Sequence, residues 1–495
     1  MGPRLSIVTP VFDPPPAALR SCINSVLGQA HADWEWILVD DGSRSPEVLS
    51  ILDEVGRHPR VTVVLRSENR GIVAASNDAL ERLTGEFVVL LDHDDALEPG
   101  ILATVLTALD EAITPVDYLY TDEAHVDLAG RVTVPFPKPP WSPERFRSSM
   151  YTCHLSVLRR DAVVEVGGFR AGFDGSQDHD LVLRVTERAA ARGHAVVHLP
   201  VMGYQWRTVT TSVSRSTHTV GRAVESGRLA VQEQCDRLGI DATVEHGPLE
   251  GTYRLRRVRA SGTTACVVVA SELRPPRQRP NTLRALSTLN SIAPVEVDTN
   301  FVIAYPADAP ADLVDLLDEA IRRGWRLVPV VGGFGLADAI DQSLTAYPAD
   351  VLVSVAPGIV ARPDLTPDWL DSLVGLATSK GAGVAGGLLC DPDGTVIHAG
   401  WELPDYRSYP LEGRQAGDAT VGHDLLIERE TSQVSLALAA VTRRQWEEAR
   451  PSVRGWWHEA GATTSGALSY VGARNLWTPY ARFDRCAPVS FELPG

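Results

Sequence analysis

Short apolar runs alternate with helical patterns along the first half of the chain. Residues 5–9, 36–39, 61–65 and 87–91 are runs of the length that suits buried strands. Residues 19–27 carry apolar side chains at helical spacing instead. Strands that alternate with helices predict an α/β fold with a mostly parallel, doubly wound sheet.

Acidic residues follow several of these strands. The carboxyl ends of parallel strands meet at one edge of a sheet, and ligands bind at that edge. The aspartates at such ends are Asp13, Asp40, Asp41, Asp92 and Asp94. We therefore expect them to converge on one site.

The densest of these acidic clusters follows the strand at residues 87–91. The chain reads Asp92, His93, Asp94 and Asp95, and three carboxylates so close together repel one another. A bound cation would relieve the repulsion, and hard oxygen ligands suit Mg²⁺ or Mn²⁺. A solvated acidic turn in front of the next helix is the alternative interpretation.

A second acidic pair lies at the start of a helix predicted within residues 172–185. An acid in the first turn of a helix can serve as a cap alone, and this interpretation stays open for Asp180. Asp178 is the stronger functional candidate because glycines at 172 and 175 flank the approach to it.

The polar segment at residues 204–218 contains Trp206 and Arg207. Two interpretations of Trp206 stay open. Its ring either covers the edge of the core or forms a platform on which a sugar stacks.

Composition restricts the possible partners. The 46 basic and 63 acidic residues give a net charge of −17, which argues against a nucleic-acid backbone as the main partner.

A length of 495 residues suggests two to four domains. We expect a cytoplasmic protein, with any membrane association peripheral at the inner face, because no signal-peptide layout or bilayer-length apolar run is present. The cysteines are scattered, as reduced thiols would be: Cys22, Cys153, Cys235, Cys266, Cys390 and Cys486.

Several segments resemble, in order, the glycosyltransferases of family 2, over roughly residues 4–240. The most similar subgroup makes bacterial surface polysaccharides such as rhamnans, O-antigens or galactofuranose polymers, and KPPWSPERF is part of that match. The resemblance implies a GT-A fold with one continuous nucleotide-binding sheet. It also implies inverting, metal-dependent transfer of a hexose from a nucleotide sugar to a glycan or lipid-linked glycan. The segments are SIVTPVFD, ILVDDGS, NRGIVAASN, VVLLDHDD, VGGFRAGFDGSQDHDL and YQWR.

The resemblance assigns donor and metal roles to residues of this chain. Asp40 would accept a hydrogen bond from the nucleotide base. Asp92 and Asp94 match the family's DxD pair, so Asp92 would face the ribose and the metal, and Asp94 would bind Mn²⁺ or Mg²⁺. The other residues expected to contact the nucleotide sugar are Pro10, Asp13, Asp41, Gly71 and His93.

The resemblance also assigns the acceptor side. Asp178 would be the general base, and Gln177 replaces the glutamate that usually precedes it in the family. Gln177, Trp206 and Arg207 would face the acceptor. His218 would be a further metal ligand, and a solvated loop histidine is the alternative.

The second half of the chain repeats the order of strand-like and helix-like segments seen in the first half, without the acidic residues that follow the strands there. We expect a catalytic domain at 1–250, a linker at 251–264 and a degenerate GT-A-like domain at 265–495. Residues 351–374 parallel 88–106, and residues 437–449 parallel 154–166.

Two further comparisons complete the expected repeat. VVGGFG, around residues 331–335, is expected where the first half has VDDGS, and residues 455–468 lie where it has GSQDHDL.

Without these carboxylates the second domain should bind neither metal nor nucleotide sugar. It would instead hold acceptor glycan, a partner enzyme or a second protomer. Four tryptophans could stack on sugars there or belong to the core: Trp401, Trp456, Trp457 and Trp477.

Two alternative functions fit the sequence less well. A sugar-nucleotide pyrophosphorylase would need a glycine- and lysine-rich phosphate loop, and residues 9–16 offer none. A non-enzymatic glycan-binding scaffold would not need Asp40, Asp92, Asp94 and Asp178 together.

Overall fold

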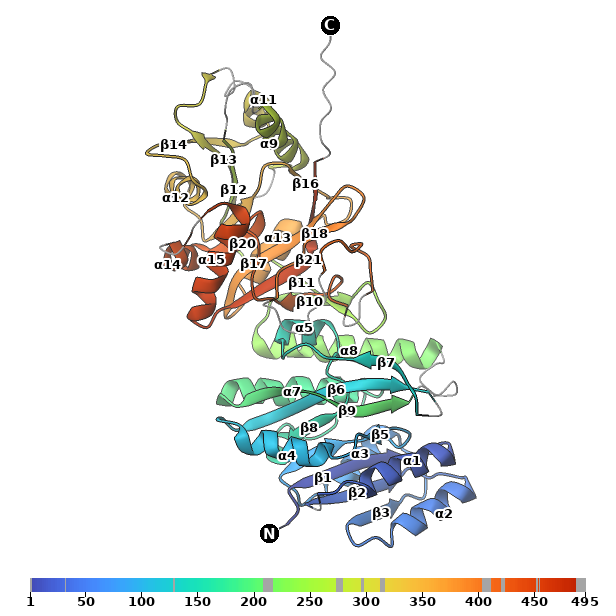
Figure 1. The fold of residues 1–495 in the computed structure, drawn as a ribbon. Helices are drawn as coiled ribbons and strands as arrows, with labels where there is room; N and C mark the ends of the chain where they lie inside the picture. Colours follow the sequence, from blue (N-terminus) through green and yellow to red (C-terminus); the bar gives the residue numbers. More distant parts are fainter. Residues whose placement is uncertain are drawn as a thin grey trace. The chain divides into compact units, whose positions relative to one another are not determined.

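The computed structural model describes residues 2–31, 33–127, 130–207, 217–272, 279–294, 298–311, 317–402, 411–419, 423–450, 453 and 455–486. The chain forms two compact units (Figure 1). The first contains residues 1–142, 149–238 and 244–253, and the second contains residues 143–148, 239–243 and 254–495. Among the described residues, no helix combines the length and apolar character needed to cross a bilayer.

The first unit is an α/β structure around a mixed sheet. The described strands run in the order β3-β2-β1-β4-β8-β6-β9-β5, and β7 pairs with β6. The strands are β1 Leu5–Val11, β2 Trp34–Asp40, β3 Val61–Leu65, β4 Phe87–Leu90, β5 Ala96–Leu97, β6 Val116–Val126, β7 Val132–Phe136, β8 Ser156–Arg159 and β9 Ala195–Arg207. The helices are α1 Pro16–Leu27, α2 Pro46–Val55, α3 Ile72–Leu80, α4 Ile101–Glu111, α6 Arg160–Glu165, α7 Gln177–Arg192 and α8 Thr217–Leu238.

The apolar runs of the sequence form the centre of this sheet. β1 pairs in parallel with β2 and β4, so the ends of these strands lie at one edge, as predicted. β8 runs antiparallel to β4, with Leu90 opposite Ser156. The predicted α/β class is therefore confirmed, and β8 brings the residues that precede it to the edge where β4 ends.

The second unit has its own sheet and its own core. Its strands run in the order β14-β13-β12-β15-β20-β17-β21-β16, with β18 on β17 and β19 on β21. The strands are β12 Ala265–Ala270, β13 Thr299–Pro306, β14 Arg326–Val330, β15 Val351–Val355, β16 Ile359–Ala361, β17 Ala382–Cys390, β18 Val396–His398, β19 Arg429–Glu430, β20 Leu438–Thr442 and β21 Arg474–Arg485. The helices are α5 Pro143–Ser148, α9 Arg279–Ser291, α11 Asp318–Arg322, α12 Leu336–Ala346, α13 Trp369–Ala377, α14 Arg443–Ala449 and α15 Trp457–Tyr470.

Strand β12 shows why the second sheet is buried on both faces. Its odd-numbered residues Ala265, Val267 and Val269 pack into one apolar cluster, and the even-numbered residues between them pack into another. Such a continuous apolar strand is typical of a sheet with helices on both faces.

The two sheets share one topology, strand for strand. In each sheet four parallel strands are followed by one antiparallel strand, β8 or β20. The next two strands pair in parallel in each sheet, β6 with β9 and β17 with β21. The second unit is therefore a structural repeat of the first, as the predicted GT-A-like duplication requires.

The expected linker at 251–264 contains regular structure. β10 (Ala242–His246) and β11 (Tyr253–Arg257) form a two-stranded sheet. Tyr253, Leu255 and Arg257 are buried because alternate side chains of β11 point to one face. The boundary between the two units falls within the predicted linker, between Tyr253 and Arg254.

The second unit includes a helix from the middle of the first unit's sequence. The Glu144 carboxylate of α5 accepts a hydrogen bond from Arg257 at 2.6 Å and pairs with Arg147 at 2.8 Å. Burial alone would raise the pKa of Glu144, but Arg147, Arg257 and Arg474 outweigh it and lower the pKa to about 2. Arg145 of the same helix pairs with Asp424. A buried ionic network therefore fixes α5 in the second unit.

Candidate active site

Asp92, Asp94 and Asp95 follow β4, and we call these three residues the acidic corner. A histidine from the segment before β8 lies beside them. Asp92, Asp95 and His154 bring potential metal-ligand atoms within 4.8 Å of one another. The His154 ring stacks on Tyr204 with ring centroids 4.6 Å apart. His154 was not among the predicted site residues, although two strands that pair antiparallel bring the start of one beside the end of the other.

Asp95 is fixed within this corner by β9. Its carboxylate accepts hydrogen bonds from the Tyr204 hydroxyl at 2.8 Å and from the Arg207 backbone N–H at 2.7 Å. The Arg207 guanidinium donates to the Asp94 carbonyl and to the Ser21 hydroxyl, each at 2.9 Å. Arg207, which was expected to face the acceptor, is instead buried and supports the backbone of the acidic corner.

The electrostatics of the corner fit a cation. Burial raises the pKa of Asp94, and the charge of Asp92 adds to the increase, while His93 opposes it. Burial and the charges of Asp92 and Asp94 raise the pKa of Asp95 well above its ordinary value. Clustered carboxylate oxygens of this kind are the ligands that Mg²⁺ and Mn²⁺ prefer.

Asp178 lies in the same cavity as Asp92. Burial raises its pKa from 3.8 to about 6, and the charge of Asp92 adds to the increase. His154 and a hydrogen bond from Gln177 oppose the increase. The cavity is lined by Val8, Pro10, Ile72, Ser76, Leu90, Leu91, Asp92, Cys153, His154, Phe169, Gln177 and Asp178.

Two acids in the first turn of α7, Asp178 and Asp180, have different interaction partners. The Gln177 side chain accepts the Gly175 N–H at 2.7 Å and donates to Asp178 at 3.3 Å, so it orients Asp178 rather than leaving its amide free for an acceptor. Asp180 is buried and forms ion pairs with Arg170 and Arg184. Asp180 therefore joins secondary structure elements, and Asp178 faces the cavity.

The end of β2 contributes two acids with different surroundings. Asp40 is buried, and one of its oxygens accepts the Ser43 N–H at 3.1 Å. Its other oxygen has no hydrogen-bond partner among the described residues. Asp41 instead accepts the backbone N–H groups of Arg70 and Gly71 and pairs with Arg66 at 2.6 Å. Asp41, expected to contact the donor, thus holds the loop before α3.

The remaining predicted donor contacts lie on neighbouring loops. Asp13 has a φ of 40°, and its carboxylate accepts the N–H groups of Arg44 and Ser45 at 2.8 and 3.0 Å. His93 Nδ1 lies 3.1 Å from the Pro10 carbonyl oxygen. These contacts join the ends of β1, β2 and β4 into one rim.

Trp206 lies beside the acidic corner. Its side chain is 38% exposed, and its edge contacts His125 and His154, with ring centroids 4.7 and 5.9 Å apart. Exposed aromatic surface next to His154 favours the sugar-stacking interpretation of Trp206. His218 falls in the first turn of α8, and its side chain lies outside the described residues.

A model of the family described as "Glycosyl transferase family 2" matches residues 6–167. The chain carries a glycosyl transferase family 2 domain. The match covers strands β1 to β8 and with them the acidic corner and His154. The predicted membership of this family is confirmed.

Two curated relatives extend the similarity into the second unit. The chain is 31% identical over 97% of its length to "Uncharacterized protein y4gI" of Sinorhizobium fredii, and covers 52% of that protein. It is 33% identical over 81% of its length to "O-antigen biosynthesis protein RfbC" of Myxococcus xanthus, and covers 32% of it. The chain thus spans about half the length, or less, of these relatives.

Solved structures with detectable likeness include TarS and a mannosyltransferase. TarS residues 1–349 of S. aureus with UDP-GlcNAc has a TM-score of 0.37 and 19% identity, covering 46% of this chain and 65% of that one. The mannosyltransferase PcManGT of Pyrobaculum calidifontis, in complex with GDP-Man and Mn²⁺, has a TM-score of 0.34 and 17% identity, covering 48% and 75%.

The strand register shows what the second unit has in place of the family 2 site. Phe87 and Val351 occupy the same position, because each lies opposite the first residue of the central strand, β1 or β12. Counting forward from this pair places Ala356, Pro357 and Gly358 where the first unit has Asp92, His93 and Asp94. The predicted loss of carboxylates at this strand end is confirmed.

The counterpart of VDDGS lies elsewhere than expected. β13 corresponds to β2 in strand order, so Tyr305 and Pro306 stand where the first unit has Asp40 and Asp41. VVGGFG follows β14, the counterpart of β3. Its placement opposite VDDGS was wrong because it followed glycine content rather than strand order.

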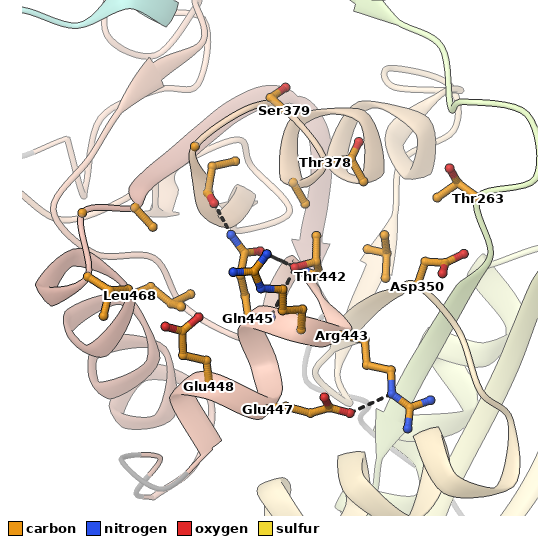
Figure 2. Close-up of a pocket in the computed structure, with 18 residues that line it drawn as sticks. Thr263, Asp350, Thr378, Ser379, Thr442, Arg443, Gln445, Glu447, Glu448 and Leu468 are labelled. Atoms are coloured by element: carbon orange, nitrogen blue, oxygen red, sulfur yellow. Dashed lines mark hydrogen bonds and ion pairs between the residues drawn. The ribbon is translucent and has the colours of Figure 1, made fainter. Parts of the chain in front are cut away.

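A cleft of about 790 Å³ lies at the other edge of the second sheet. Figure 2 shows its lining, including Asp350, Thr442 and Gln445, where β15 begins and β20 ends. Arg443 in this cleft pairs with Glu447 at 2.9 Å. Because Ala356 follows the opposite end of β15, the cleft is not the counterpart of the family 2 site.

Proposed function

We propose that the first unit transfers a sugar from a nucleotide sugar to a hydroxyl of a glycan or lipid-linked glycan, with inversion, in bacterial surface polysaccharide synthesis. The observation that carries the proposal is Asp178, a carboxyl with a pKa of about 6 in the same cavity as the acidic corner. The names of the relatives support this class, since they include an O-antigen biosynthesis protein and a chondroitin synthase of Escherichia coli.

The donor would bind along the rim formed by the ends of β1, β2 and β4. The unpartnered oxygen of Asp40 would accept an N–H of the nucleotide base, which would satisfy an otherwise buried and unpaired atom. Asp92 and Asp94 would hold Mn²⁺ or Mg²⁺, with Asp95 and His154 beside them. When bound, such an ion neutralises the charge that develops on a leaving diphosphate.

Asp178 would act as the general base. Its carboxylate takes the proton of the acceptor hydroxyl while the hydroxyl oxygen forms a bond to the anomeric carbon and the bond to the diphosphate oxygen breaks. A single displacement of this kind inverts the configuration and needs no second carboxylate as nucleophile. A carboxylate with a pKa near 6 is a stronger base than an ordinary aspartate, and Gln177 keeps it in position.

The second unit would take no part in the chemistry. Its counterparts of the donor-binding acids are Tyr305, Pro306, Ala356 and Gly358, and none can bind a divalent ion through a carboxylate. A pure glycan-binding scaffold is disfavoured for the first unit, because a partly buried Asp178 that costs stability near neutral pH would have no purpose there.

The test is a screen of nucleotide sugars with the purified full chain and Mn²⁺. We expect one donor to raise the melting temperature and to release nucleoside diphosphate when glycan acceptor is added. The Asp178→Asn variant should keep the thermal shift and lose the release. Release at the wild-type rate by this variant would contradict the proposal, as would the absence of any donor-dependent shift across the screen.

A further inference from the structure

The tryptophans of the second unit fall into two groups. Trp325, Trp369, Trp446 and Trp477 are buried in its core. Trp477, one of the predicted sugar-stacking residues, is fully buried and donates its indole N–H to the Gly387 carbonyl, so the core interpretation holds for it. Trp401, Trp456 and Trp457 are only partly buried. Partial exposure of several large aromatic rings in one region is a feature of ligand-binding surfaces.

The Trp401 ring forms a cluster with two histidines. It lies 5.4 Å from His458 and 4.4 Å from His398, measured between ring centroids, and both contacts are edge-on. Trp456 and Trp457 precede His458 in the sequence and pack against the core. We call Trp401, His398 and His458 the Trp401 cluster.

The backbone holds Trp401 in a fixed position. Trp401 and Gln433 exchange two backbone hydrogen bonds of 2.8 and 3.0 Å, and the Thr431 hydroxyl donates to the Trp401 carbonyl at 2.9 Å. An aromatic ring held this way loses little conformational entropy when a ligand stacks on it.

The cluster lies at the place that Asp178 has in the first unit. α15 corresponds to α7, because each lies between a short helix and the last long strand of its sheet. α15 begins at Trp457 and α7 begins at Gln177, so His458 takes the position of Asp178. The Trp457 carbonyl accepts the N–H of Leu436, close to the strand end that lost its acids.

Polar groups surround the exposed rings. The indole N–H of Trp401 donates to Glu412 at 3.0 Å, and both Glu412 and His458 are exposed. His398 is buried, and its Nε2 accepts the N–H groups of Gly400 and Ser435. Its Nδ1 therefore carries the proton and has no hydrogen-bond partner among the described residues. The cluster thus combines aromatic surface with both acceptors and a donor.

We propose that the Trp401 cluster binds hexose units of the growing polysaccharide. This proposal rests on the proposed function, because the glycan is the acceptor of the first unit. The apolar C–H face of a pyranose stacks on the exposed indoles, while its hydroxyls hydrogen-bond to Glu412 and His458. With no carboxylate at the metal position or at position 458, the second unit holds the glycan without reacting with it.

The experiment measures glycan binding to the full chain by tryptophan fluorescence and calorimetry, in EDTA and without nucleotide sugar. The probes are tetra- to hexasaccharides of rhamnose, galactose, mannose and glucose. We expect at least one series to bind, and Trp401→Ala and His458→Ala to weaken that binding about tenfold or more. The matched control is Tyr470→Ala, which removes an aromatic ring that is 93% exposed on the same helix α15 and lies outside the cluster.

The outcomes separate this proposal from the proposed function. Glycan binding that Trp401→Ala abolishes and Asp178→Asn preserves supports the cluster, whether or not transfer is ever detected. Binding by none of the four series, or undiminished binding by both cluster variants, overturns it. Circular dichroism of each variant checks that the fold is intact, and His458→Ala decides the outcome if Trp401→Ala does not fold.

Discussion

The two units of this chain have the same strand order and differ in the residues that follow the strands. Asp92, His93 and Asp94 follow β4, whereas Ala356, Pro357 and Gly358 follow β15. The sheet does not need the acids, since the second unit forms it without them. Buried strands and helices fix the fold, and a few residues at the carboxyl ends of the strands carry the chemistry.

The largest expected effect concerns Asp178, the proposed general base of the first unit. Asp178→Asn should lower the transfer rate by about 10²–10⁴-fold, because the amide cannot take the acceptor proton. Donor affinity should change little, since Asp178 does not hold the nucleotide. The measurement is nucleoside diphosphate release alongside donor binding by calorimetry. The exposed Asp161, 77% accessible in its side chain, provides the control Asp161→Asn, which should transfer normally.

The next test concerns the proposed metal position, which has no carboxylate in the second unit. Asp94→Ala gives the first unit a small side chain where the second has Gly358, and should remove the Mn²⁺-dependent part of donor binding. Calorimetry with and without Mn²⁺ measures this effect, with Asp53→Asn as the control at an exposed acid. For the wild type we expect about one donor per chain. Two bound donors would contradict the view that only the first unit binds nucleotide sugar.

A third test concerns α5, which belongs to the second unit although its sequence lies between segments of the first unit. Glu144→Ala removes the carboxylate that pairs with the buried Arg147 and Arg257, although Arg257 keeps Glu428, and should destabilise the protein by about 3–5 kcal/mol. Glu165→Ala removes an acid that is 45% exposed and pairs with Arg188 and Arg192, and should destabilise the protein far less than Glu144→Ala does. Urea unfolding compares the two variants. Equal stability of both would show that the buried network around α5 contributes nothing.

The smallest expected effect is a gain in stability. The pKa of Asp178 in the folded protein, about 6, lies above its ordinary value of 3.8, so its contribution is complete below pH 4 and is lost as the pH rises through 6. In metal-free protein at pH 7 to 8, Asp178→Asn should therefore be more stable than the wild type by about 3 kcal/mol. Thermal melts in EDTA from pH 5 to 8 measure the difference. A stability difference between the variant and the wild type that decreases as the pH rises would contradict this prediction.

The gathering of acids at one edge could be predicted from the sequence. Strand ends are readable from apolar runs, and the parallel pairing of β2, β1 and β4 places Asp40 and Asp92 at one edge of the sheet. The hydrogen-bond and ion-pair partners of individual side chains could not be predicted, because they depend on which side chains meet in the folded structure. Asp41 holds a loop and Arg207 supports a backbone carbonyl, although their sequence positions alone suggest donor and acceptor contacts.

His154 and the second-unit counterpart of VDDGS show a different limit. His154 precedes an antiparallel strand, so it reaches the acidic corner only once β8 is known to lie beside β4. The VVGGFG segment was assigned to the wrong strand because the intervening β13 carries no acidic signature. Both errors concern strand order, which hydrophobic patterns along a chain do not specify.

The assignment of α5 to the second unit has a consequence for synthesis on the ribosome. Ser148 precedes His154 by only a few residues, yet the partners of α5 include Arg257, Asp424 and Arg474, which are translated much later. The charged helix must therefore wait for most of the polypeptide to emerge before it can be buried. A prematurely terminated product that ends near residue 250 lacks all of these partners, so nascent fragments would leave the ribosome with the segment leading to His154 unanchored.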